Sequence, residues 1–555
     1  MFCDKTGVNQ LTALLASHGF RDIVVCPGSR NGALVHNFHQ CREIFTLHSV
    51  TDERSAAFVA IGIYLSERKP VALCVTSGSA LLNTLPGVAE AYFRHVPLLV
   101  ISADRPAERI GQLDGQTLFQ PDALKPYAAS YNLPETDRPQ DCRLRNRLIN
   151  EAILSMQHNG KRPVHINVPL TEPLFTFSTT GLPAERIICE IRPTVAAAPL
   201  PEDLTARIAR AHFPVLLIGQ YEEDLSAPLR QFEENSSLLV LPELIGNSSY
   251  SWRTNMLEEI ISGMRFAPDM VIHAGGNQVN KLLKFRLRET DGCEVIRIEE
   301  STDFPDTFDH LSVIVRSSPL TILPHLAETL PANENVRRMQ RLLAAYRKRI
   351  EDFQTDTLSD LSIMKMLCDE LRHSPISALH LGNSSVVRNA LYFFDKNDFP
   401  VYCNRGTNGI EGSVSVACGY SLKKNGLSLL LVGDLSFFYD QNALWIQGIG
   451  GNLRIVLFNN GGGQIFHSLQ GLSSSPSRDR YIAASHQCAA CGIARSYGLG
   501  YFSINTLSEA QETIRQFLTT ESDRPVLLEV FTDPRINGEA LENMHNCFRT
   551  IINTK

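Results

Sequence analysis

Apolar and polar positions alternate along the chain with two different periods. Near the start, Leu11, Leu14 and Leu15 lie on one face of a predicted helix that ends near Gly19. The segment DIVVCPGSR, residues 22–30, follows as a continuous apolar run that leads into a turn, which is typical of a strand buried on both faces. The chain therefore begins with a helix and a buried strand.

The same alternation continues through the first module. Apolar runs predict further strands at 44–50, 70–76 and 96–102, and helical stretches are predicted between them at 55–69 and 79–95. Because each helix carries the chain back to begin the next strand in the same direction, we expect a parallel sheet with right-handed crossovers and helices on both faces.

Two more sets of strands and helices follow, so the predicted fold class is α/β, with three doubly wound parallel-sheet domains. The second set has the strands PVLLIGQ, SLLVLPE, MVIHAGG, CEVIRIEE and LSVIVRS. The third set has the strands ISALHLGNSS, PVYCNRG, LSLLLVGD, LRIVLFNN, YFSIN and PVLLEVFTD. A length of 555 residues agrees with three or more domains of about 150 residues each.

Changes in composition mark the boundaries between the predicted domains. A segment rich in Pro and Ala at 188–203 is typical of a linker, and charged, helix-favouring sequence at 336–360 predicts a connecting helix. The first domain then spans 1–187, the central domain 204–335 and the last domain 361–555.

Composition and charge narrow the class of function. The formal net charge of −7 is spread along the chain without a long basic tract, which argues against nucleic acid as a partner. No apolar run reaches the roughly 18 residues that span a bilayer, and the first residues do not resemble a signal peptide. We therefore expect a cytoplasmic protein with no membrane span, in which the 13 cysteines are reduced.

The strongest chemical signal is the segment GDLSFFYDQNALWIQGIGGNLRIVLFNNGGGQIF, residues 433–466. One predicted strand ends at Gly433 and Asp434, and the next ends at Asn460, before a run of glycines. Because ligands of parallel sheets bind at the carboxyl ends of the strands, we expect Asp434 and Asn460 to lie side by side. Their oxygens suit Mg²⁺, and the helix after Asp434 can receive a diphosphate, whereas a structural turn explains either dipeptide alone.

This spacing resembles the signature of thiamine-diphosphate-dependent enzymes, which is Gly-Asp-Gly followed further along the chain by Asn-Asn. Asp434 and Asn460 stand 26 residues apart, and Leu435 replaces the last glycine of the first part. A leucine would be strained there if the backbone needed a positive φ, although no metal ligand is lost.

The first module offers Glu53, in FTLHSVTDERSAAF, as the acidic residue that such a site needs. Thiamine activation requires a carboxyl group that shares a proton with the aminopyrimidine ring, and an apolar pocket keeps a Glu protonated near neutral pH. The alternative interpretation is an exposed acid in the first turn of a helix, stabilised by the helix dipole. The downstream signature favours Glu53 as the catalytic residue.

Arginines recur at turns that follow predicted strands, namely Arg30 in PGSR, Arg105 in SADRP, Arg388 in GNSSVVR and Arg405 in NRG. A guanidinium binds a carboxylate through two hydrogen bonds, so these side chains suit substrates with more than one carboxylate. For any single arginine, a surface ion pair is the alternative. Residue chemistry thus predicts anionic substrates without identifying them.

Motifs in the first and last modules carry a closer resemblance. They are CPGSRNGAL, TDERSAAFVAIGIYLSERKPVALCVTSGSA, ISADRPAERIGQLDGQT, LGNSSVVR, NRGTNGIEG, GDLSFFYDQNALW and NNGGGQIF. In order and spacing they resemble the 2-succinyl-5-enolpyruvyl-6-hydroxy-3-cyclohexene-1-carboxylate synthase family of menaquinone biosynthesis. The resemblance implies a pyrimidine-binding first domain, a central domain without cofactor and a last domain that binds diphosphate and Mg²⁺.

The resemblance also implies roles for individual residues. Glu53 would activate thiamine diphosphate, and Mg²⁺ or Mn²⁺ would be held by Asp434, Asn460 and Gly462. Other cofactor contacts are implied for Ile410, which would lie beneath the thiazolium, and for Gly433, Gln464 and Ile465. Substrate contacts are implied for Ser29, Arg30, Arg105, Gln116, Lys281, Ser384, Arg388, Arg405, Ile465, Phe466 and Leu469.

Two departures from the family pattern concern the substrate rather than the cofactor. In NQVNKLLKFR only Lys281 matches a pair of basic residues that is frequent in the family, because Leu282 follows it. Gly115 stands before Gln116, where we would expect a side-chain amide. Both departures bear on how isochorismate would be recognised.

The implied function is a transferase reaction that depends on thiamine diphosphate. Decarboxylation of 2-oxoglutarate would give a succinyl-semialdehyde carbanion, which would add to isochorismate in a 1,4 fashion to form the product after which the family is named. The family also implies a homodimer or homotetramer with the cofactor at the subunit interface. Two alternatives stay open: another thiamine-diphosphate carboligase or decarboxylase, similar to acetolactate synthase, and a relative that keeps the fold without catalysis.

Overall fold

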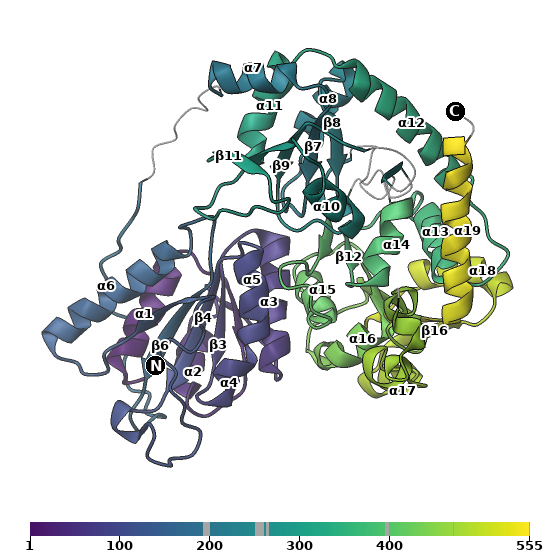
Figure 1. The fold of residues 1–555 in the computed structure, drawn as a ribbon. Coiled ribbons are helices and arrows are strands. Elements are labelled where there is room, and N and C mark those ends of the chain that lie inside the picture. Colours follow the sequence, from purple (N-terminus) through teal and green to yellow (C-terminus); the bar gives the residue numbers. More distant parts are fainter. Residues whose placement is uncertain (192–199, 250–259, 262–265, 395–398, 470, 554–555) are drawn as a thin grey trace. The chain divides into compact units, whose positions relative to one another are not determined.

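The computed structural model describes residues 1–191, 200–249, 260–261, 266–394, 399–469 and 471–553. It contains three sheets surrounded by helices, which confirms the predicted α/β class (Figure 1). Contacts divide the chain into two compact units. Residues 1–193, 406–425 and 439–453 form unit 1, and residues 194–405, 426–438 and 454–555 form unit 2.

The first sheet belongs to unit 1 and has the strand order β2-β1-β3-β4-β6-β5, with every pair parallel. Its strands are β1 (Asp22–Val25), β2 (Thr46–Ser49), β3 (Val71–Val75), β4 (Leu98–Asp104), β5 (Ala129–Asn132) and β6 (Val164–Pro169). Its helices are α1 (Thr6–Ser17), α2 (Gly32–Gln40), α3 (Glu53–Glu67), α4 (Ser79–Asn83), α5 (Leu85–Phe93) and α6 (Pro139–Ser155). Figure 1 shows α1 and α6 on one face of this sheet and α3 and α5 on the other.

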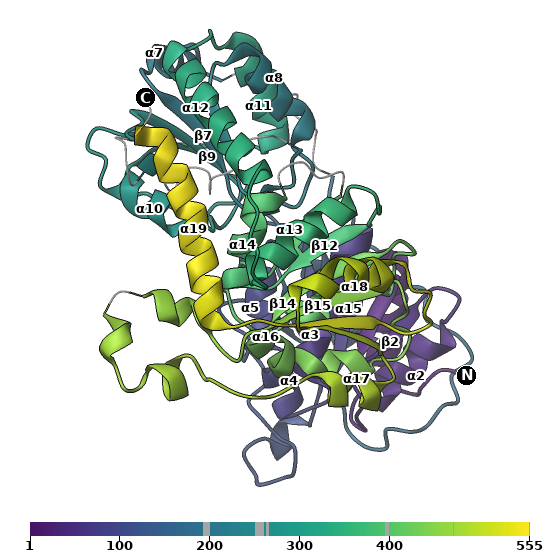
Figure 2. The same ribbon diagram turned by 90° about the vertical axis from the view of Figure 1, so that its right-hand side faces the viewer.

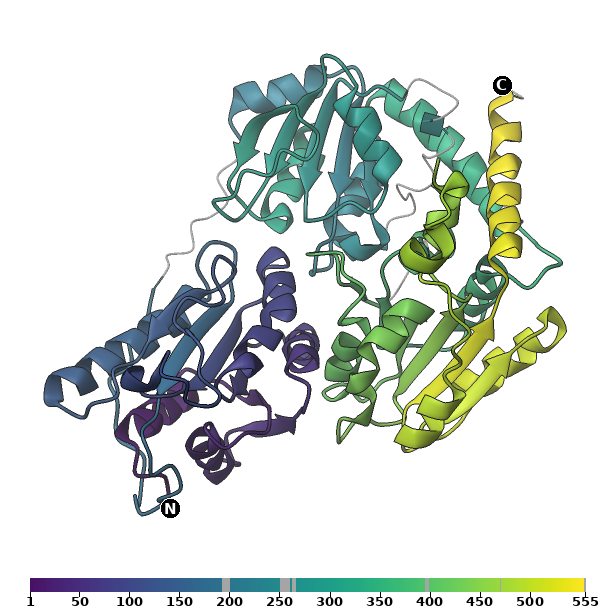
Figure 3. The ribbon, with the colours of Figure 1, turned by 60° about the horizontal axis from the view of Figure 1, so that its bottom comes forward.

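The second sheet and, apart from Leu453, the third belong to unit 2, and Figure 3 shows the strands of each side by side. The second sheet is parallel, in the order β11-β10-β9-β7-β8, with β7 (Pro214–Ile218), β8 (Leu239–Pro242), β9 (Met270–Ala274), β10 (Glu294–Ile298) and β11 (Leu311–Val315). The third has the order β13-β12-β14-β15-β17-β16, with β12 (Ala378–Leu381), β13 (Val401–Cys403), β14 (Ser428–Gly433), β15 (Leu453–Asn459), β16 (Gly500–Ile504) and β17 (Val526–Phe531).

Most helices of unit 2 pack around these two sheets. They are α7 (Glu202–Arg210), α8 (Ser226–Asn235), α10 (Lys281–Arg288), α11 (Pro319–Thr329), α12 (Glu334–Glu351), α13 (Asp360–Leu371), α14 (Ser385–Phe393), α17 (Cys491–Tyr497), α18 (Leu507–Thr519) and α19 (Pro534–Asn553). Figure 2 shows α19 as a long helix, and it packs against α12 and α13. Helix α15 (Ser413–Ser421) belongs to unit 1. In helix α16 (Asp434–Asp440), residues 434–438 belong to unit 2 and residues 439–440 to unit 1.

Each strand predicted from the sequence is confirmed, but β5 and β6 were not predicted. Strand β6 reads VHINVP, and its buried polar residues His165 and Asn167 interrupt the apolar run that marks the other strands. The single helix predicted at 79–95 is wrong, because the structure has α4 and α5 there. Pro86 lacks an amide hydrogen and is tolerated best in the first turn of a new helix.

The expected domain boundaries stay a prediction. Helix α12 occupies much of the segment expected to connect the central and last domains and ends at Glu351. Residues 192–199 of the expected linker at 188–203 lie outside the described residues. No helix among the described residues is both long enough and apolar enough to cross a membrane.

Helices α3 and α15 pack against each other within unit 1 at glycine contacts. A Cβ on Gly62 would lie 2.1 Å from the carbonyl oxygen of Val416, and a Cβ on Gly419 would lie 2.1 Å from that of Val59. Neither position can hold a larger residue without separating the helices. Helix α3 is buried on nearly all sides, which explains why its sequence is apolar around the whole circumference.

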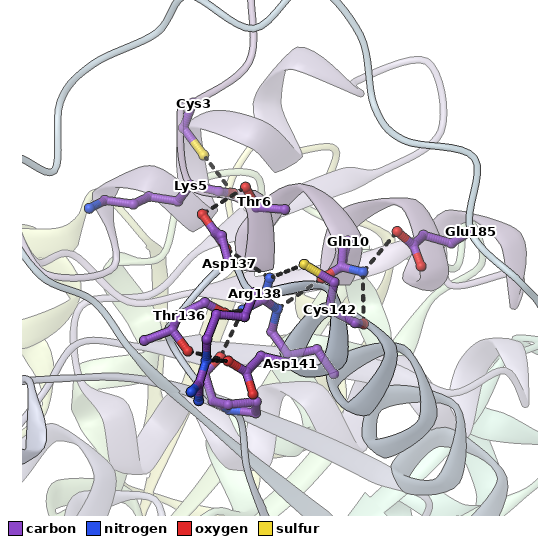
Figure 4. A network of polar contacts seen from close by, with 12 residues as sticks. Cys3, Lys5, Thr6, Gln10, Thr136, Asp137, Arg138, Asp141, Cys142 and Glu185 are labelled. Carbon is purple, nitrogen blue, oxygen red and sulfur yellow. Dashed lines mark hydrogen bonds and ion pairs between the residues drawn. The ribbon is translucent and has the colours of Figure 1, made fainter.

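A buried arginine, Arg145, joins α6 to α1 and to the loop before α6. Figure 4 shows three of the residues that it contacts, Gln10, Thr136 and Asp137, in a network of polar contacts. The Arg145 side chain is 1% exposed, and its Nε donates to Gln10 Oε1 at 2.8 Å. Its Nη1 donates to the carbonyl oxygens of Pro134 at 3.0 Å and Thr136 at 2.6 Å, and its Nη2 to Asp137 Oδ1 at 2.9 Å. Every nitrogen of the guanidinium therefore has an acceptor, which makes burial of its charge tolerable.

Replacing Arg145 by Met should lower the free energy of unfolding by about 3 kcal/mol, because the substitution leaves buried carbonyl oxygens without donors. Urea denaturation followed by circular dichroism would measure this as an earlier midpoint of unfolding. Arg147→Met, on an exposed position of the same helix, is the matched control and should change stability by less than about 0.5 kcal/mol. Equal midpoints for the two variants would contradict the anchoring role of Arg145.

Candidate active site

Asp434 lies at the carboxyl end of β14 and begins α16. It is 3% exposed and accepts three backbone N–H groups: Oδ1 from Leu435 at 2.6 Å, and Oδ2 from Asn460 at 3.1 Å and Gly462 at 2.9 Å. Burial raises the pKa of Asp434, while the Gly462 amide and nearby His486 favour its charged form. Asp434 and the loop after β15 thus lie side by side, as the spacing of the two strands predicts.

Asn460 follows β15, and its side-chain amide has hydrogen-bond partners at the nitrogen but not at the oxygen among the described residues. Its Nδ2 donates to Asp360 Oδ2 at 3.3 Å and to Gln464 Oε1 at 3.0 Å, which supports this orientation of the amide. Its Oδ1 is buried and has no hydrogen-bond partner among the described residues. A buried acceptor without a donor is unfavourable unless a ligand satisfies it, so this oxygen suits a cation.

Gly462 completes the loop with a backbone conformation that needs glycine. Its φ is +145°, and a Cβ there would lie 2.7 Å from the carbonyl oxygen of Ala483. Glycine therefore lets the loop bring its own amide to Asp434. A carboxylate, an amide oxygen and a backbone carbonyl are the hard oxygen donors that Mg²⁺ prefers, so these residues fit that ion.

Leu435 stands where the resembling signature has glycine. The structure places it inside α16 with a φ that is not positive. A leucine adopts this helical conformation without strain, and its amide still donates to Asp434. The departure from the signature is therefore compatible with the loop geometry.

Asp360, the first residue of α13, supports Asn460 and was missed by the sequence reasoning. Its Oδ2 accepts from Asn460 Nδ2, and its Oδ1 accepts from Thr532 Oγ1 at 2.7 Å. Burial raises the pKa of Asp360 to about 6. It lies 100 positions before Asn460 in the sequence, so no local motif could have linked the two residues.

Glu53 begins α3 in unit 1, directly after the residue that caps the helix. The capping carboxylate of Asp52 accepts from the amides of Arg54 at 2.9 Å and Ser55 at 3.2 Å. Glu53 itself is half-buried, and its Oε2 accepts from Asn83 Nδ2 at 3.3 Å. The described residues of unit 1 thus give Glu53 a fixed backbone and a polar neighbour.

The loop that carries Ile410 is held by a buried carboxylate that the sequence reasoning missed. Glu90, on α5, is fully buried and accepts from the amides of Gly406 at 3.0 Å and Thr407 at 2.7 Å. It also accepts from Thr407 Oγ1 at 2.9 Å. Ile410 is 40% exposed on this loop, which belongs to unit 1 and leads into α15.

Arg30 and Arg105 come together at the carboxyl edge of the first sheet. Arg30 follows β1 and is buried, while Arg105 directly follows β4. Both reach the carboxylate of Glu172, another residue that the sequence reasoning did not single out. Ser29 is exposed beside Arg30.

Gln116 is placed by the residues around it. Its Nε2 donates to the carbonyl oxygen of Ser77 at 3.3 Å, and its own carbonyl accepts from Ser77 Oγ at 3.0 Å. Gln120, fully buried, accepts from the Gly78 amide at 2.8 Å and donates to Asn167 Oδ1 at 2.9 Å. The loop that carries Gln116 is therefore anchored to the buried polar residues of the sheet.

His165 belongs to the same buried network. Its Nε2 lies 2.7 Å from Ser102 Oγ, which also contacts Gln120 Nε2 and Asn167 Oδ1. Burial lowers the pKa of His165 to about 4, so the ring is neutral near neutral pH. A neutral ring fits a network made of hydroxyl and amide groups.

A cavity of about 810 Å³ in unit 2 has several expected residues in its wall. These are Lys281, Arg388, Gln464 and Ile465. Further basic residues in the wall are His467, Arg478, Arg535 and His545, while its acidic residues are Asp360 and Asp533. A cavity of this size with a mainly basic wall suits small anionic molecules.

Ser384 and Arg405 are not among the residues that line this cavity. Ser384 has a φ of +71°, an unusual conformation for serine, and its carbonyl oxygen accepts from Arg388 Nη1 at 2.7 Å. Arg405 is 6% exposed and donates to Asn383 Oδ1 at 3.2 Å and Asn277 Oδ1 at 3.0 Å. Its Nε is buried without a partner among the described residues.

The expected site residues occur in both units. Unit 1 holds Ser29, Arg30, Glu53, Arg105, Gln116 and Ile410, and unit 2 holds Lys281, Ser384, Arg388, Arg405, Gly433, Asp434, Asn460, Gly462, Gln464, Ile465, Phe466 and Leu469. In unit 2, Phe466 is half-buried in the short helix Gln464–Ser468, and Leu469 is 48% exposed. The functional roles of these residues stay predictions.

Comparisons with known families match both ends of the chain. The model of the thiamine pyrophosphate enzyme N-terminal TPP binding domain matches residues 5–125, and that of the C-terminal TPP binding domain matches residues 381–530. Among solved structures, benzoylformate decarboxylase from Polynucleobacter necessarius is similar with a TM-score of 0.71 and 17% identity, over 96% of this chain and 99% of that one. At this identity the likeness concerns the fold alone.

Curated proteins are similar over nearly the whole chain. A protein of Bacteroides thetaiotaomicron is 38% identical, covering 98% of this chain and 99% of its own length. A protein of Phocaeicola vulgatus is 40% identical, covering 96% of both chains, and one of Desulfotalea psychrophila is 34% identical, covering 96% of this chain and 99% of its own. All three carry the name 2-succinyl-5-enolpyruvyl-6-hydroxy-3-cyclohexene-1-carboxylate synthase.

The buried neutral His165 predicts a pH-dependent stability. Its folded pKa of about 4 lies below the ordinary value of 6.5, so between these pH values the unfolded chain binds a proton that the folded chain does not. The free energy of unfolding should therefore fall, by up to about 3 kcal/mol, as the pH decreases from 6.5 to 4. Urea denaturation at several pH values should show a shallower decrease in His165→Gln than in the wild type.

The exposed His39 provides the matched control for this pH series. His39→Gln should keep the slope of the wild type, because this substitution leaves the buried network of His165 unchanged. The same slope in all three proteins would show that His165 does not cause the loss of stability in acid.

Proposed function

This chain belongs to the 2-succinyl-5-enolpyruvyl-6-hydroxy-3-cyclohexene-1-carboxylate synthase family of thiamine-diphosphate-dependent enzymes, and we propose that it decarboxylates 2-oxoglutarate and adds the resulting four-carbon unit to isochorismate. The observation that carries this proposal is the 38–40% identity, over nearly the full length, to relatives with that name. The enzyme is accordingly a transferase that forms a carbon–carbon bond. The oxygen donors around Asp434 and the basic cavity of unit 2 support this assignment.

The cofactor, when bound, supplies the electron sink that stabilises the charge left by the departing CO₂. We infer that Asp434, Asn460 and Gly462 hold Mg²⁺ or Mn²⁺, because a buried carboxylate, an unsatisfied amide oxygen and a glycine loop meet there. Asp360 would keep the amide oxygen of Asn460 available by binding its nitrogen. Further contacts to the cofactor are proposed for Gly433, Gln464 and Ile465.

Glu53 would share a proton with the aminopyrimidine ring of the cofactor. Its position at the first turn of α3 is fixed by the Asp52 cap and by the close packing of α3 on α15. Ile410 would support the cofactor from beneath the thiazolium, on a loop that Glu90 holds in place. Both residues would thus be positioned by buried contacts of unit 1.

Cationic, polar and apolar side chains would hold the substrates. In unit 1 the proposed residues are Ser29, Arg30, Arg105 and Gln116, and in unit 2 they are Lys281, Ser384, Arg388, Arg405, Ile465, Phe466 and Leu469. Arginines bind carboxylates through paired hydrogen bonds, so they would orient 2-oxoglutarate and isochorismate before reaction. Holding two anionic reactants in a defined geometry is a large part of the catalytic task.

The remaining expectations concern the assembly and location of the enzyme. We propose a homodimer or homotetramer with the cofactor at the subunit interface, as the family implies, and a cytoplasmic location. We also propose a domain organisation with a pyrimidine-binding domain at 1–187, a central domain at 204–335 and a diphosphate-binding domain at 361–555. Sedimentation of the purified enzyme would distinguish a dimer from a tetramer.

Release of CO₂ from 2-oxoglutarate is the direct test of the proposed reaction. Purified enzyme with thiamine diphosphate and Mg²⁺ should release CO₂ in a manner that depends on isochorismate. Glu53→Gln should reduce this turnover by about 100-fold or more, because it removes the proton-sharing carboxyl group. Glu67→Gln, at the other end of α3, is the matched control and should retain the activity of the wild type.

Each other outcome of this assay has a defined meaning. Turnover of pyruvate alone would replace the proposed reaction with one similar to that of acetolactate synthase. Absence of turnover with every substrate, in an enzyme that binds the cofactor, would reject the substrate assignment. Full activity of Glu53→Gln would reject the role of Glu53.

The metal site can be tested without catalysis. Addition of thiamine diphosphate and Mg²⁺ should raise the melting temperature of the wild type, and this increase should be smaller in Asn460→Ala. Loss of one ligand is expected to weaken binding at least about tenfold, which corresponds to about 1.4 kcal/mol less stabilisation. Asn505→Ala, an exposed asparagine directly after β16 of the same sheet, should keep the increase of the wild type.

A further inference from the structure

Two arginines in unit 1 share one carboxylate that is not assigned to the site. Glu172 Oε1 lies 3.1 Å from Arg30 Nη2 and 3.8 Å from Arg105 Nη1. Glu172 belongs to the segment just after β6, while the arginines follow β1 and β4. All three residues thus meet at the carboxyl edge of the first sheet, where ligands of parallel sheets bind.

The three side chains differ strongly in exposure. The side chain of Arg30 is 6% exposed and that of Arg105 26%, whereas that of Glu172 is 70% exposed. Arg30 is held further by the bond from its Nη1 to the carbonyl oxygen of Leu170 at 2.9 Å. The cations are therefore built into the protein, while the carboxylate lies over them on the solvent side.

The donors of the two arginines are only partly used in this arrangement. Arg105 Nε is buried and has no hydrogen-bond partner among the described residues. Glu172 approaches both cations through the same oxygen, so it does not form the two parallel hydrogen bonds that an arginine can offer a carboxylate. A ligand carboxylate that binds through both of its oxygens could accept hydrogen bonds from the arginine donors that Glu172 does not use.

We propose that Glu172 is an internal carboxylate that occupies the anion site of Arg30 and Arg105 and gives way to a substrate carboxylate. This inference rests on the proposed function, which places both arginines in the substrate site. Without substrate, Glu172 compensates two neighbouring cations. Because the Glu172 side chain is largely exposed to solvent, its ion pairs are weak enough to be exchanged.

Competition of this kind affects substrate binding rather than the chemical step. Removal of the negative charge of Glu172 leaves the arginines free to bind a ligand carboxylate. Glu172→Gln should therefore lower the KM of one of the two anionic substrates by about two- to fivefold and leave kcat unchanged. The ligand-free variant should also melt at a slightly lower temperature, since two cations lose their counter-charge.

The test compares steady-state kinetics of the wild type, Glu172→Gln and the control Glu43→Gln, an exposed carboxylate that lies 4.0 Å from Arg42. KM values for 2-oxoglutarate and isochorismate are measured separately. A lower KM for either substrate in Glu172→Gln alone supports the proposal. Unchanged or higher KM values for both, or a lower kcat, overturn it, because Glu172 would then be neutral or would help to position the arginines.

Two further measurements make the result specific. In the Arg105→Gln background the effect of Glu172→Gln should shrink, because one of the two coupled cations is gone, and an undiminished effect would overturn the shared site. Thermal titration with 2-oxoglutarate requires no turnover, so it tests the exchange independently of the reaction. If the wild type binds 2-oxoglutarate without catalysis, the proposed function fails, while tighter binding by Glu172→Gln still supports the exchange.

Discussion

The close contact between α3 and α15 is the constraint on which the arrangement of unit 1 depends. Gly62 and Gly419 let the two backbones approach to a distance that any side chain would prevent. This contact joins residues 406–425 to the first sheet although residues 194–405, which belong to unit 2, intervene in the sequence. It also sets the place of Glu53, which begins α3, and of the Ile410 loop, which leads into α15.

In unit 2, polar groups that cannot be left unsatisfied define the loop after β15. Asp434 takes the amides of this loop, and Asp360 takes the side-chain nitrogen of Asn460. Among the described residues, none donates a hydrogen bond to the buried Asn460 Oδ1. Because Asp434 and the side-chain nitrogen of Asn460 both have partners, the unsatisfied oxygen is the atom of this loop that suits a cation.

The sequence predicted the parts that follow from local patterns. Apolar runs such as those of β3 and β14 mark strands buried on both faces, and the spacing of Asp434 and Asn460 marks two strand ends. Strand β6 was not predicted because His165 and Asn167 are polar and interrupt its apolar run. Their burial depends on side-chain hydrogen bonds to residues that only the folded chain brings together. The supporting roles of Asp360 and Glu90 were not predicted either, because each residue binds a loop that is distant in sequence.

The proposed anion and cation sites differ in whether a side chain of the protein itself pairs with their binding groups in the absence of a ligand. Arg30 and Arg105 form ion pairs with the carboxylate of Glu172. Because this side chain is exposed to solvent, a ligand carboxylate that binds the arginines more strongly can displace it. Asn460 Oδ1 has no comparable partner among the described residues, since a cationic side chain in that loop would occupy the position that we propose for the metal ion. An exchangeable internal carboxylate therefore suits a site that would bind and release substrates, whereas an unsatisfied oxygen suits a site that would retain its ion.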